Sequence, residues 1–297
     1  MSALLAAAAF VALWSTGFIV ARAIHPYADP NLYLLARFGG TALLFAMIAL
    51  ASRARWPARR EWGRQLLAGA LLQGVYLGAS YWAVAQGLPA GVMALLGALQ
   101  PLATAVLAVP LFGERLPARG WAGMALGVAG VALVLAPKLA AAGATATAHG
   151  AAGASAFTVL VAVLSIASIT AGTLYQKSAV AQTDLRTAVA LQNAGAALVA
   201  AAFALALGET HWQPAPTLWL GLAWGIAMLS GGAIVLFVWL LRHGGAARAT
   251  SLMFLAPPLA ALQGYWLFGE TLGALQLAGF AVALAGVALA RWSRWSR

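Results

Sequence analysis

Long apolar runs alternate with short polar segments along almost the whole chain. Each run is rich in alanine and leucine and approaches the ~20 residues that an α-helix needs to cross the hydrocarbon core of a bilayer. Membrane-spanning strands would instead alternate in polarity over about ten residues. The pattern predicts an all-α membrane protein with ten transmembrane helices, at Ala3–Ile24, Leu32–Ala51, Leu66–Gln86, Ala90–Phe112, Ala118–Ala136, Phe157–Ser178, Thr187–Leu207, Leu218–Leu241, Ala246–Phe268 and Ala274–Trp292.

The composition agrees with a protein whose surface faces lipid. Of the 297 residues, 63% are hydrophobic and only 8% are charged, with a mean hydropathy of +0.89. A soluble domain carries roughly 25% charged residues, which this chain could not supply. The apolar start, Met1 to Ala12, has no basic segment before it. We therefore expect a retained first helix and not a cleaved signal peptide.

The basic residues predict the orientation of the chain in the membrane. Most of the 17 lysines and arginines lie in the loops after the second, fourth, sixth and eighth predicted helices and in the C-terminal tail. Basic loops face the cytoplasm, so we expect both termini there. Arg22 and Arg37 are exceptions, because they lie within helices near the outer end. Arg22 and its counterpart Lys177 would extend to the interface or attract a substrate carboxylate, and we favour the former.

The chain contains an internal repeat. Residues 99–134 recur as residues 255–290 at a shift of 156, with the Leu-Phe-Gly-Glu corner at 111–114 matching 267–270. At a shift of 155, Gly17 matches Gly172, which extends the repeat to the first helix of each half. Five helices is an odd number, so the second half would enter the membrane upside down, as in secondary transporters.

This repeat predicts two inverted five-helix repeats joined by a connector. The first repeat would occupy residues 1–136 and the second residues 157–297. Residues 137–156 are mostly small and of low complexity, which predicts a flexible periplasmic linker.

Prolines interrupt the fourth and ninth predicted helices in corresponding places. Pro101 lacks an N–H group, as do Pro257 and Pro258, so backbone carbonyls one turn earlier lose their partners. Such carbonyls persist at membrane depth only where protein or a water-filled cavity satisfies them. Matched breaks predict helix breaks and gating on a transport pathway. The alternative is a kink that only assists packing.

Polar and aromatic residues within the spans are candidates for substrate binding. Tyr76 and Ser80 share a helix face because they are four residues apart. Interhelical hydrogen bonds or simple packing are the alternative for each candidate. We also considered Ser15, Thr16, Ser165, Gln192, Asn193 and Ser230. The residues that we predict to bind substrate are Trp14, Gln73, Tyr76, Ser80, Tyr81, Gln100, Ser168 and Tyr175.

The remaining acidic residues and histidines predict no chemistry. No Asp, Glu or His lies in the middle of a predicted span, which favours facilitated movement over proton coupling. Glu114 and Glu270 lie at helix corners, where we expect structural caps. Asp29, Glu209, His25 and His211 are expected to be solvated loop residues. We predict no catalytic group, metal site or cofactor, and therefore no enzyme.

Several motifs together resemble the drug/metabolite transporter superfamily, in particular its EamA-type ten-helix exporters. They are Trp14-Ser15 with Phe18, Arg37-Phe38, Gly87-Leu88-Pro89-Ala90, Pro101, and the two corners Leu111-Phe112-Gly113-Glu114-Arg115-Leu116 and Leu267-Phe268-Gly269-Glu270-Thr271-Leu272. The resemblance implies alternating access and a central cavity lined mainly by the first, third, fourth, sixth, eighth and ninth helices. The most similar branch is the bacterial inner-membrane exporters of aromatic and other neutral amino acids.

We therefore predict a multi-pass inner-membrane exporter of amino acids and related small metabolites. Its partners would be an amino acid substrate and the lipid bilayer, without nucleic acid or an obligatory protein partner, so we expect a monomer. A transporter of drugs or sugar-linked metabolites with the same fold is the alternative. A non-transporting membrane scaffold is less favoured.

Overall fold

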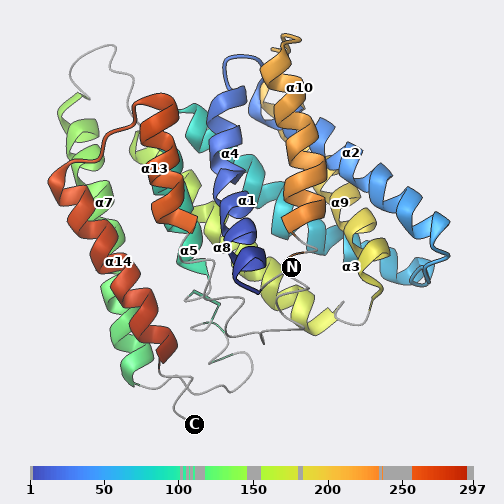
Figure 1. The fold of residues 1–297 in the computed structure, drawn as a ribbon, viewed down its shortest axis with the longest axis horizontal. Helices are drawn as coiled ribbons and strands as arrows, with labels where there is room; N and C mark the ends of the chain where they lie inside the picture. Colours follow the sequence, from blue (N-terminus) through green and yellow to red (C-terminus); the bar gives the residue numbers. More distant parts are fainter. Residues whose placement is uncertain are drawn as a thin grey trace.

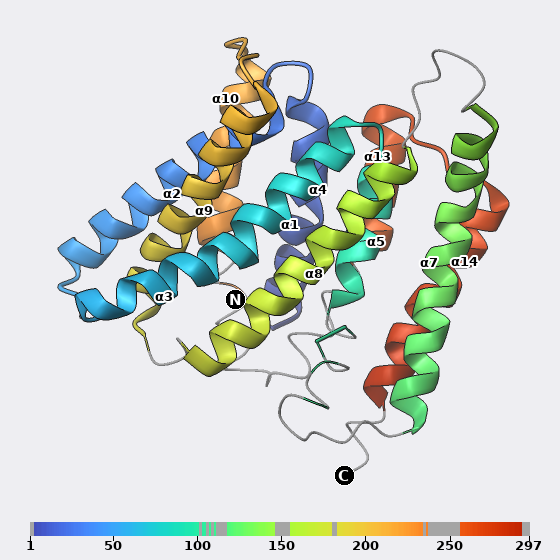
Figure 2. The ribbon, with the colours of Figure 1, turned by 180° about the vertical axis from the view of Figure 1, so that it is seen from behind.

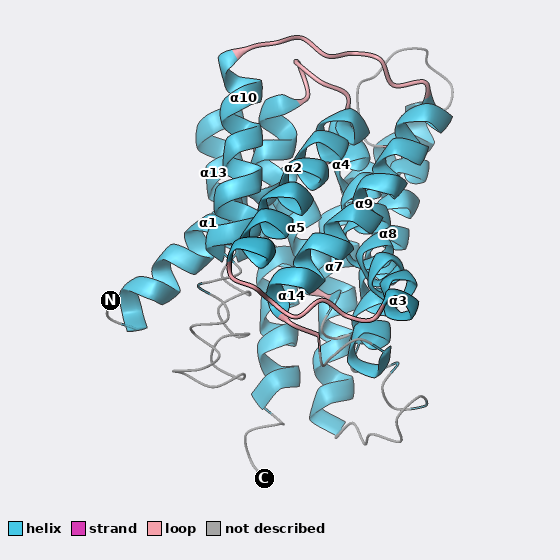
Figure 3. Ribbon diagram, turned by 90° about the vertical axis from the view of Figure 1, so that its right-hand side faces the viewer, coloured by secondary structure: helices cyan, strands magenta, loops and turns pink. Residues whose placement is uncertain are grey.

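The chain folds into a bundle of α-helices (Figures 1 and 2). The computed structural model describes residues 3–100, 103–104, 107, 110, 118–145, 155–179, 183–233, 236 and 256–292. Its helices are α1 (Ala3–Ile24), α2 (Pro30–Ala51), α3 (Arg59–Gly69), η1 (Ala70–Val75), α4 (Tyr76–Ala85), α5 (Ala90–Ala98), α7 (Ala118–Thr145), α8 (Ala156–Ala179), α9 (Leu185–Leu207), α10 (Pro216–Ala223), η2 (Trp224–Gly232), α13 (Ala256–Phe268) and α14 (Ala274–Trp292). Among these residues only an isolated bridge joins Ala28 to Trp212, and Figure 3 shows helices and loops alone.

Several helices have the length and composition of membrane spans. Within the described ranges, five are long and apolar enough to cross a bilayer: Leu5–Ile24, Pro30–Ala51, Arg59–Ala85, Ala156–Gln176 and Leu185–Leu207. Ala118–Val134 and Ala274–Gly286 are shorter apolar helices. The predicted all-helical membrane architecture is confirmed at this level.

The helix boundaries differ from the prediction in three places. The third helix begins at Arg59 and not at Leu66, because its polar first turns are helical too. The fifth continues to Thr145, past the predicted end at Ala136, through an alanine-rich segment of high helix propensity. The fourth is interrupted at Leu99, whose amide donates to the Leu96 carbonyl in a tighter turn, and the described residues beyond it, at 100, 103–104, 107 and 110, are helical again. This interruption precedes Pro101, which lies outside the described residues.

The ends of α2 and α9 follow local sequence signals. Pro30 occupies the first turn of α2, where its missing N–H has no partner to lose. Asp184 precedes α9, and its side chain accepts the Arg186 amide at 2.9 Å. Gly208 ends α9 with a φ of 66°, a left-handed conformation that glycine adopts without steric cost.

Two π-helical segments lie in the middle of spans, η1 in the first half and η2 in the second. Wider π turns are rare and leave carbonyls that need new donors. Ser168 donates to the Leu71 carbonyl of η1 at 2.8 Å, and Ser230 donates to the Gly225 carbonyl of η2 at 3.0 Å. Serine side chains therefore satisfy backbone groups in both segments.

Helices α7 and α14 form a pair that lies to one side of the other helices (Figure 1). A Cβ added at Gly130 would collide with Gly279 and Ala283, and one added at Gly286 would collide with Gly123 and Gly127. Because the early part of one helix meets the late part of the other, the two helices run antiparallel. Small residues permit this close backbone approach.

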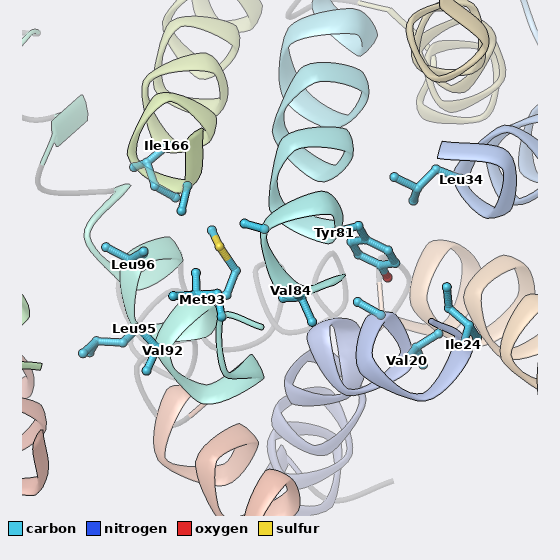
Figure 4. Close-up of a cluster of buried hydrophobic side chains, with 14 of the residues drawn as sticks. Val20, Ile24, Leu34, Tyr81, Val84, Val92, Met93, Leu95, Leu96 and Ile166 are labelled. Carbon is cyan, nitrogen blue, oxygen red and sulfur yellow. The ribbon is translucent and has the colours of Figure 1, made fainter. Parts of the chain in front are cut away.

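The remaining helices share a core at the centre of the bundle. Helices α2 and α9 pack together, α5 packs on α13, and α4 packs on α8. Figure 4 shows Met93 and Leu96 of α5 beside Ile166 of α8, and Tyr81 of α4 opposite Leu34 of α2. These side chains are buried or nearly so. The core therefore joins helices from both halves of the chain.

The acidic residues of two connecting segments are partly exposed and also have specific partners that the expectation of solvated loop residues did not include. Asp29 accepts the Thr210 and His211 amides at 2.9 and 2.8 Å. Glu209 accepts the Asn31 side-chain amide at 2.6 Å and the Asn31 backbone amide at 2.8 Å. The sequence alone did not indicate these hydrogen bonds, because the residues that they join lie far apart along the chain. The two segments thus connect the halves of the chain.

The histidine of the first of these segments is also partly buried. Desolvation, with the Arg22 charge, lowers the pKa of His25. Arg22 itself lies 3.7 Å from Glu270, between Nε and Oε1. This ion pair gives Arg22 a protein partner.

Candidate functional site

A cavity of about 270 Å³ lies between helices of both halves. It is lined by α1, α4, η1, α5, α8, η2 and α13, which correspond to the six spans that the family resemblance implied, and by Arg37 of α2. The lining residues are Trp14, Ser15, Gly17, Phe18, Arg37, Leu72, Gln73, Tyr76, Leu77, Tyr81, Ala94, Gly97, Ala98, Gln100, Ile169, Leu229, Ser230, Ala256 and Pro257.

Aromatic side chains form one wall of the cavity. The Phe18 ring packs edge-on against Tyr76 with centroids 6.5 Å apart, and it lies 6.4 Å from the Tyr81 ring. Tyr81 in turn stacks on Tyr33 at 6.0 Å. Trp14 is 42% exposed, so much of its surface is available to a ligand. Such a wall suits a planar or apolar group.

Arg37 is the charged residue of the cavity lining. It comes from the second turn of α2 and is only 7% exposed. Its Nη1 donates to the Tyr81 hydroxyl at 3.1 Å, and that hydroxyl donates to the Gly17 carbonyl at 2.8 Å. Its Nε is buried and has no hydrogen-bond partner. None of the described lining residues is an Asp or Glu, so none of them neutralises the guanidinium.

Gln100 links the end of α5 to α8. Its Nε2 donates to Thr104 at 2.9 Å and to Thr173 at 3.0 Å. The Thr104 hydroxyl also donates to the Gln100 carbonyl at 2.9 Å, which satisfies a backbone group where the helix is interrupted. With both amide hydrogens engaged, the side-chain oxygen of Gln100 is the atom that could accept a donor from a ligand.

The structure brings together some of the predicted site residues. Trp14, Gln73, Tyr76, Tyr81 and Gln100 all line the cavity, together with Pro257.

Other predicted residues have structural partners. Ser80 is fully buried and donates to Ser165 at 3.0 Å, joining α4 to α8. Ser168 is engaged with η1, and neither Tyr175 nor Pro258 is among the lining residues. Glu270 pairs with Arg22, while Gln276 accepts the Gly273 amide at the start of α14. Pro101 and Glu114 lie outside the described residues, and the cap role of Glu270 stays a prediction.

Sequence reasoning did not select Arg37 and Phe18 as site residues. Both belong to motifs that carry the family resemblance, and an arginine within a span was the available signal. We found no cluster of His, Cys, Asp or Glu suited to a metal ion in the described ranges.

Comparison with known proteins gives the chain a family. A profile of the EamA-like transporter family matches residues 1–136 and 156–292. The chain is 25% identical over 280 residues to the uncharacterized inner membrane transporter YedA of Escherichia coli K12, covering 93% of this chain and 86% of YedA. The same values hold for YedA of Escherichia coli O157:H7. One solved crystal structure, 21% identical, covers 100% of this chain and 99% of its own with a TM-score of 0.63, which shows the fold.

Proposed function

This chain belongs to the EamA-like transporter family, and from that premise we propose that it exports amino acids and related small metabolites across the bacterial inner membrane. The supporting observation is the central cavity and its lining. An aromatic and apolar wall would accept a side chain, while Arg37, Gln100 and hydroxyl groups would bind the polar end.

The size of the cavity favours a small substrate. Its volume of about 270 Å³ is near the lower end of the ~300–1,000 Å³ typical of small-molecule sites. The absence of an acidic lining residue also argues against a cationic drug.

The packing of the helices supports transport by alternating access between two inverted repeats. Gly130 meets Gly279 while Gly286 meets Gly123, and each residue of the second contact is the repeat counterpart of one in the first. Such reciprocal contacts between antiparallel helices are what a two-fold axis in the membrane plane produces. Equivalent helices also pack on each other in the pairs α2–α9 and α5–α13.

We further propose that transport is facilitative and that both termini face the cytoplasm. Among the residues that the structure describes at the cavity there is no Asp, Glu or His that could carry a proton. The orientation rests on the excess of basic residues in the loops assigned to the cytoplasm.

Counterflow in proteoliposomes tests this proposal. The purified protein would be assayed with labelled phenylalanine, methionine and threonine, with and without a pH gradient. We expect uptake of at least one amino acid that does not depend on the gradient. No flux of any of these amino acids would contradict the substrate class, and gradient-driven accumulation would contradict facilitation.

Matched aromatic variants test whether this cavity is the route. Trp14→Ala and Tyr76→Ala should lower counterflow roughly tenfold or more, because loss of an aromatic contact surface costs about 1–3 kcal/mol. Trp266→Ala and Tyr265→Ala are suitable controls, because these side chains are 72% and 55% exposed on α13 and do not line the cavity. Equal effects in both pairs would contradict the site.

A further inference from the structure

We propose that Arg37 binds a carboxylate of the transported molecule, so that the cavity selects small organic acids and amino acids over their neutral analogues. The inference rests on the proposed function in taking this cavity as the substrate site. It adds the chemical group that the site recognises and the residue that recognises it.

Arg37 is a buried cation that forms no ion pair with a carboxylate in the part of the chain that the structure describes. Removal of a guanidinium from water is unfavourable by several kcal/mol unless an anion or hydrogen-bond acceptors replace the water. Within the described part of the chain, its side chain makes one hydrogen bond, from Nη1 to Tyr81, which engages one of five N–H donors. Ionisable groups at such positions within membrane helices mark ligand or ion pathways.

Three described carboxylates in the connecting segments have other partners. Glu270 pairs with Arg22, and Glu209 accepts hydrogen bonds from Asn31. Asp29 accepts two backbone amides of the segment before α10. None of these groups therefore neutralises Arg37.

Neighbouring groups position the guanidinium at the cavity. Tyr81 anchors Nη1 and is itself fixed by the Gly17 carbonyl. On the other side, a Cβ at Gly225 would lie 2.9 Å from the Arg37 Cδ and 3.1 Å from Nε. Only glycine at this position of η2 leaves the arginine side chain its space. An anchored arginine with unused donors is preorganised for an anion.

The chemistry favours a carboxylate over a phosphate. Two parallel N–H donors of a guanidinium match the two oxygens of a carboxylate. A phosphate of nearly two charges would leave excess negative charge beside a single arginine, because Arg37 is the one cation among the described lining residues. The aromatic wall beside Arg37 suits the apolar part of such an acid.

Binding of matched acids and amides to the protein in lipid nanodiscs tests the proposal. The probes are L-phenylalanine against L-phenylalaninamide, and 3-phenylpropanoate against 3-phenylpropanamide, measured by isothermal titration. We expect each acid to bind roughly 10- to 100-fold more tightly than its amide, the ratio expected for hydrogen bonds to charged groups. Equal affinities within the pairs, or no binding of either acid, would overturn the proposal.

Variants then assign the preference to Arg37. Arg37→Gln should abolish the difference between acid and amide, and Arg37→Lys should retain part of it because the charge remains. Arg60→Gln, which removes an exposed charge at the start of α3, should leave the preference unchanged. A preserved preference in Arg37→Gln would contradict the assignment. If Arg37→Gln does not fold, the wild-type pairs and Arg37→Lys still decide the outcome.

These results are distinguishable from those of the transport assay. Acid-selective binding without counterflow would support the role of Arg37 and contradict the export function. Counterflow without any acid preference would support the export function and contradict the role of Arg37.

Discussion

Arg37 and Gln192 occupy equivalent positions in the two halves of the chain but have opposite surroundings. The shift of 155 residues that pairs Gly17 with Gly172 also pairs Arg37 with Gln192. Both residues are 7% exposed, and each packs on a glycine of the other half: the Arg37 side chain lies against Gly225, and the Gln192 backbone lies against Gly69. Gln192 donates to Gln65 at 2.9 Å, and Gln65 donates to Thr183 at 2.6 Å. Gln192 is thus hydrogen-bonded to protein, whereas Arg37 borders the cavity with its Nε unpartnered.

The contrast extends to the π segments. Tyr76, directly after η1, contributes an aromatic ring to the cavity, and its counterpart Gly232 at a shift of 156 has no side chain. At the α7–α14 pair, by comparison, both halves contribute small residues in reciprocal contacts. The halves therefore resemble each other where they pack together and differ where the cavity forms. A symmetric framework with an asymmetric centre is what a binding site for an asymmetric small molecule requires.

Introduction of an arginine at position 192 should have the largest effect on stability. Gln192→Arg would place an uncompensated cation beside Gln65, and neither residue lines the described cavity. We expect the free energy of unfolding in mixed micelles to fall by about 3 kcal/mol or more. Gln192→Met is the matched control, because it removes only the hydrogen bond and should cost about 1 kcal/mol. Equal stability of these two variants would mean that position 192 can accommodate a charge as position 37 does.

Alanine substitutions at the paired glycines should show how symmetric the framework is. Gly130→Ala and Gly286→Ala each place a Cβ against backbone of the opposite helix, and overpacking of this kind costs about 1–3 kcal/mol. The two losses should be similar, as measured by unfolding in mixed micelles. Gly39→Ala is the control, because a Cβ there meets nothing within 4 Å and should be neutral or slightly stabilising. Strongly unequal losses would contradict the reciprocal packing.

The spans could be predicted because their ends coincide with changes from apolar to polar sequence. Helices α1 and α14 have the predicted bounds for that reason. The first turns of α3 were missed, because Arg59, Arg60 and Arg64 are polar but still helical. Hydropathy identifies the residues that lie in lipid, but a helix can continue beyond the lipid into polar sequence.

The site could be predicted only in part, because burial at a helix interface depends on neighbours distant in sequence. Tyr76 and Ser80 share a helix face, but Tyr76 meets the cavity while Ser80 meets Ser165 of α8. An arginine near the end of a span ordinarily extends to the interface. That Arg37 instead turns inward follows from Tyr81, which the chain brings to it from another helix.

The smallest expected effect concerns the equivalent acids Asp29 and Asp184, which precede α2 and α9. Asp184→Ala removes a helix cap and should lower the free energy of unfolding by about 1 kcal/mol, whereas Asp29→Ala frees exposed amides that water can satisfy and should cost less.

Hydrogen bonds from Arg186 lower the pKa of Asp184. The contribution of Asp184 to stability is therefore present above the ordinary carboxyl pKa of about 3.9 and is lost as the pH falls through the lowered value. Unfolding measured between pH 7 and pH 2.5 should therefore show wild type and Asp184→Ala converging at low pH. Asp184→Asn, which can cap but carries no charge, should keep a constant difference from Asp184→Ala. A loss for Asp29→Ala as large as that for Asp184→Ala would contradict the contrast, because the two acids would then stabilise their helices to the same extent.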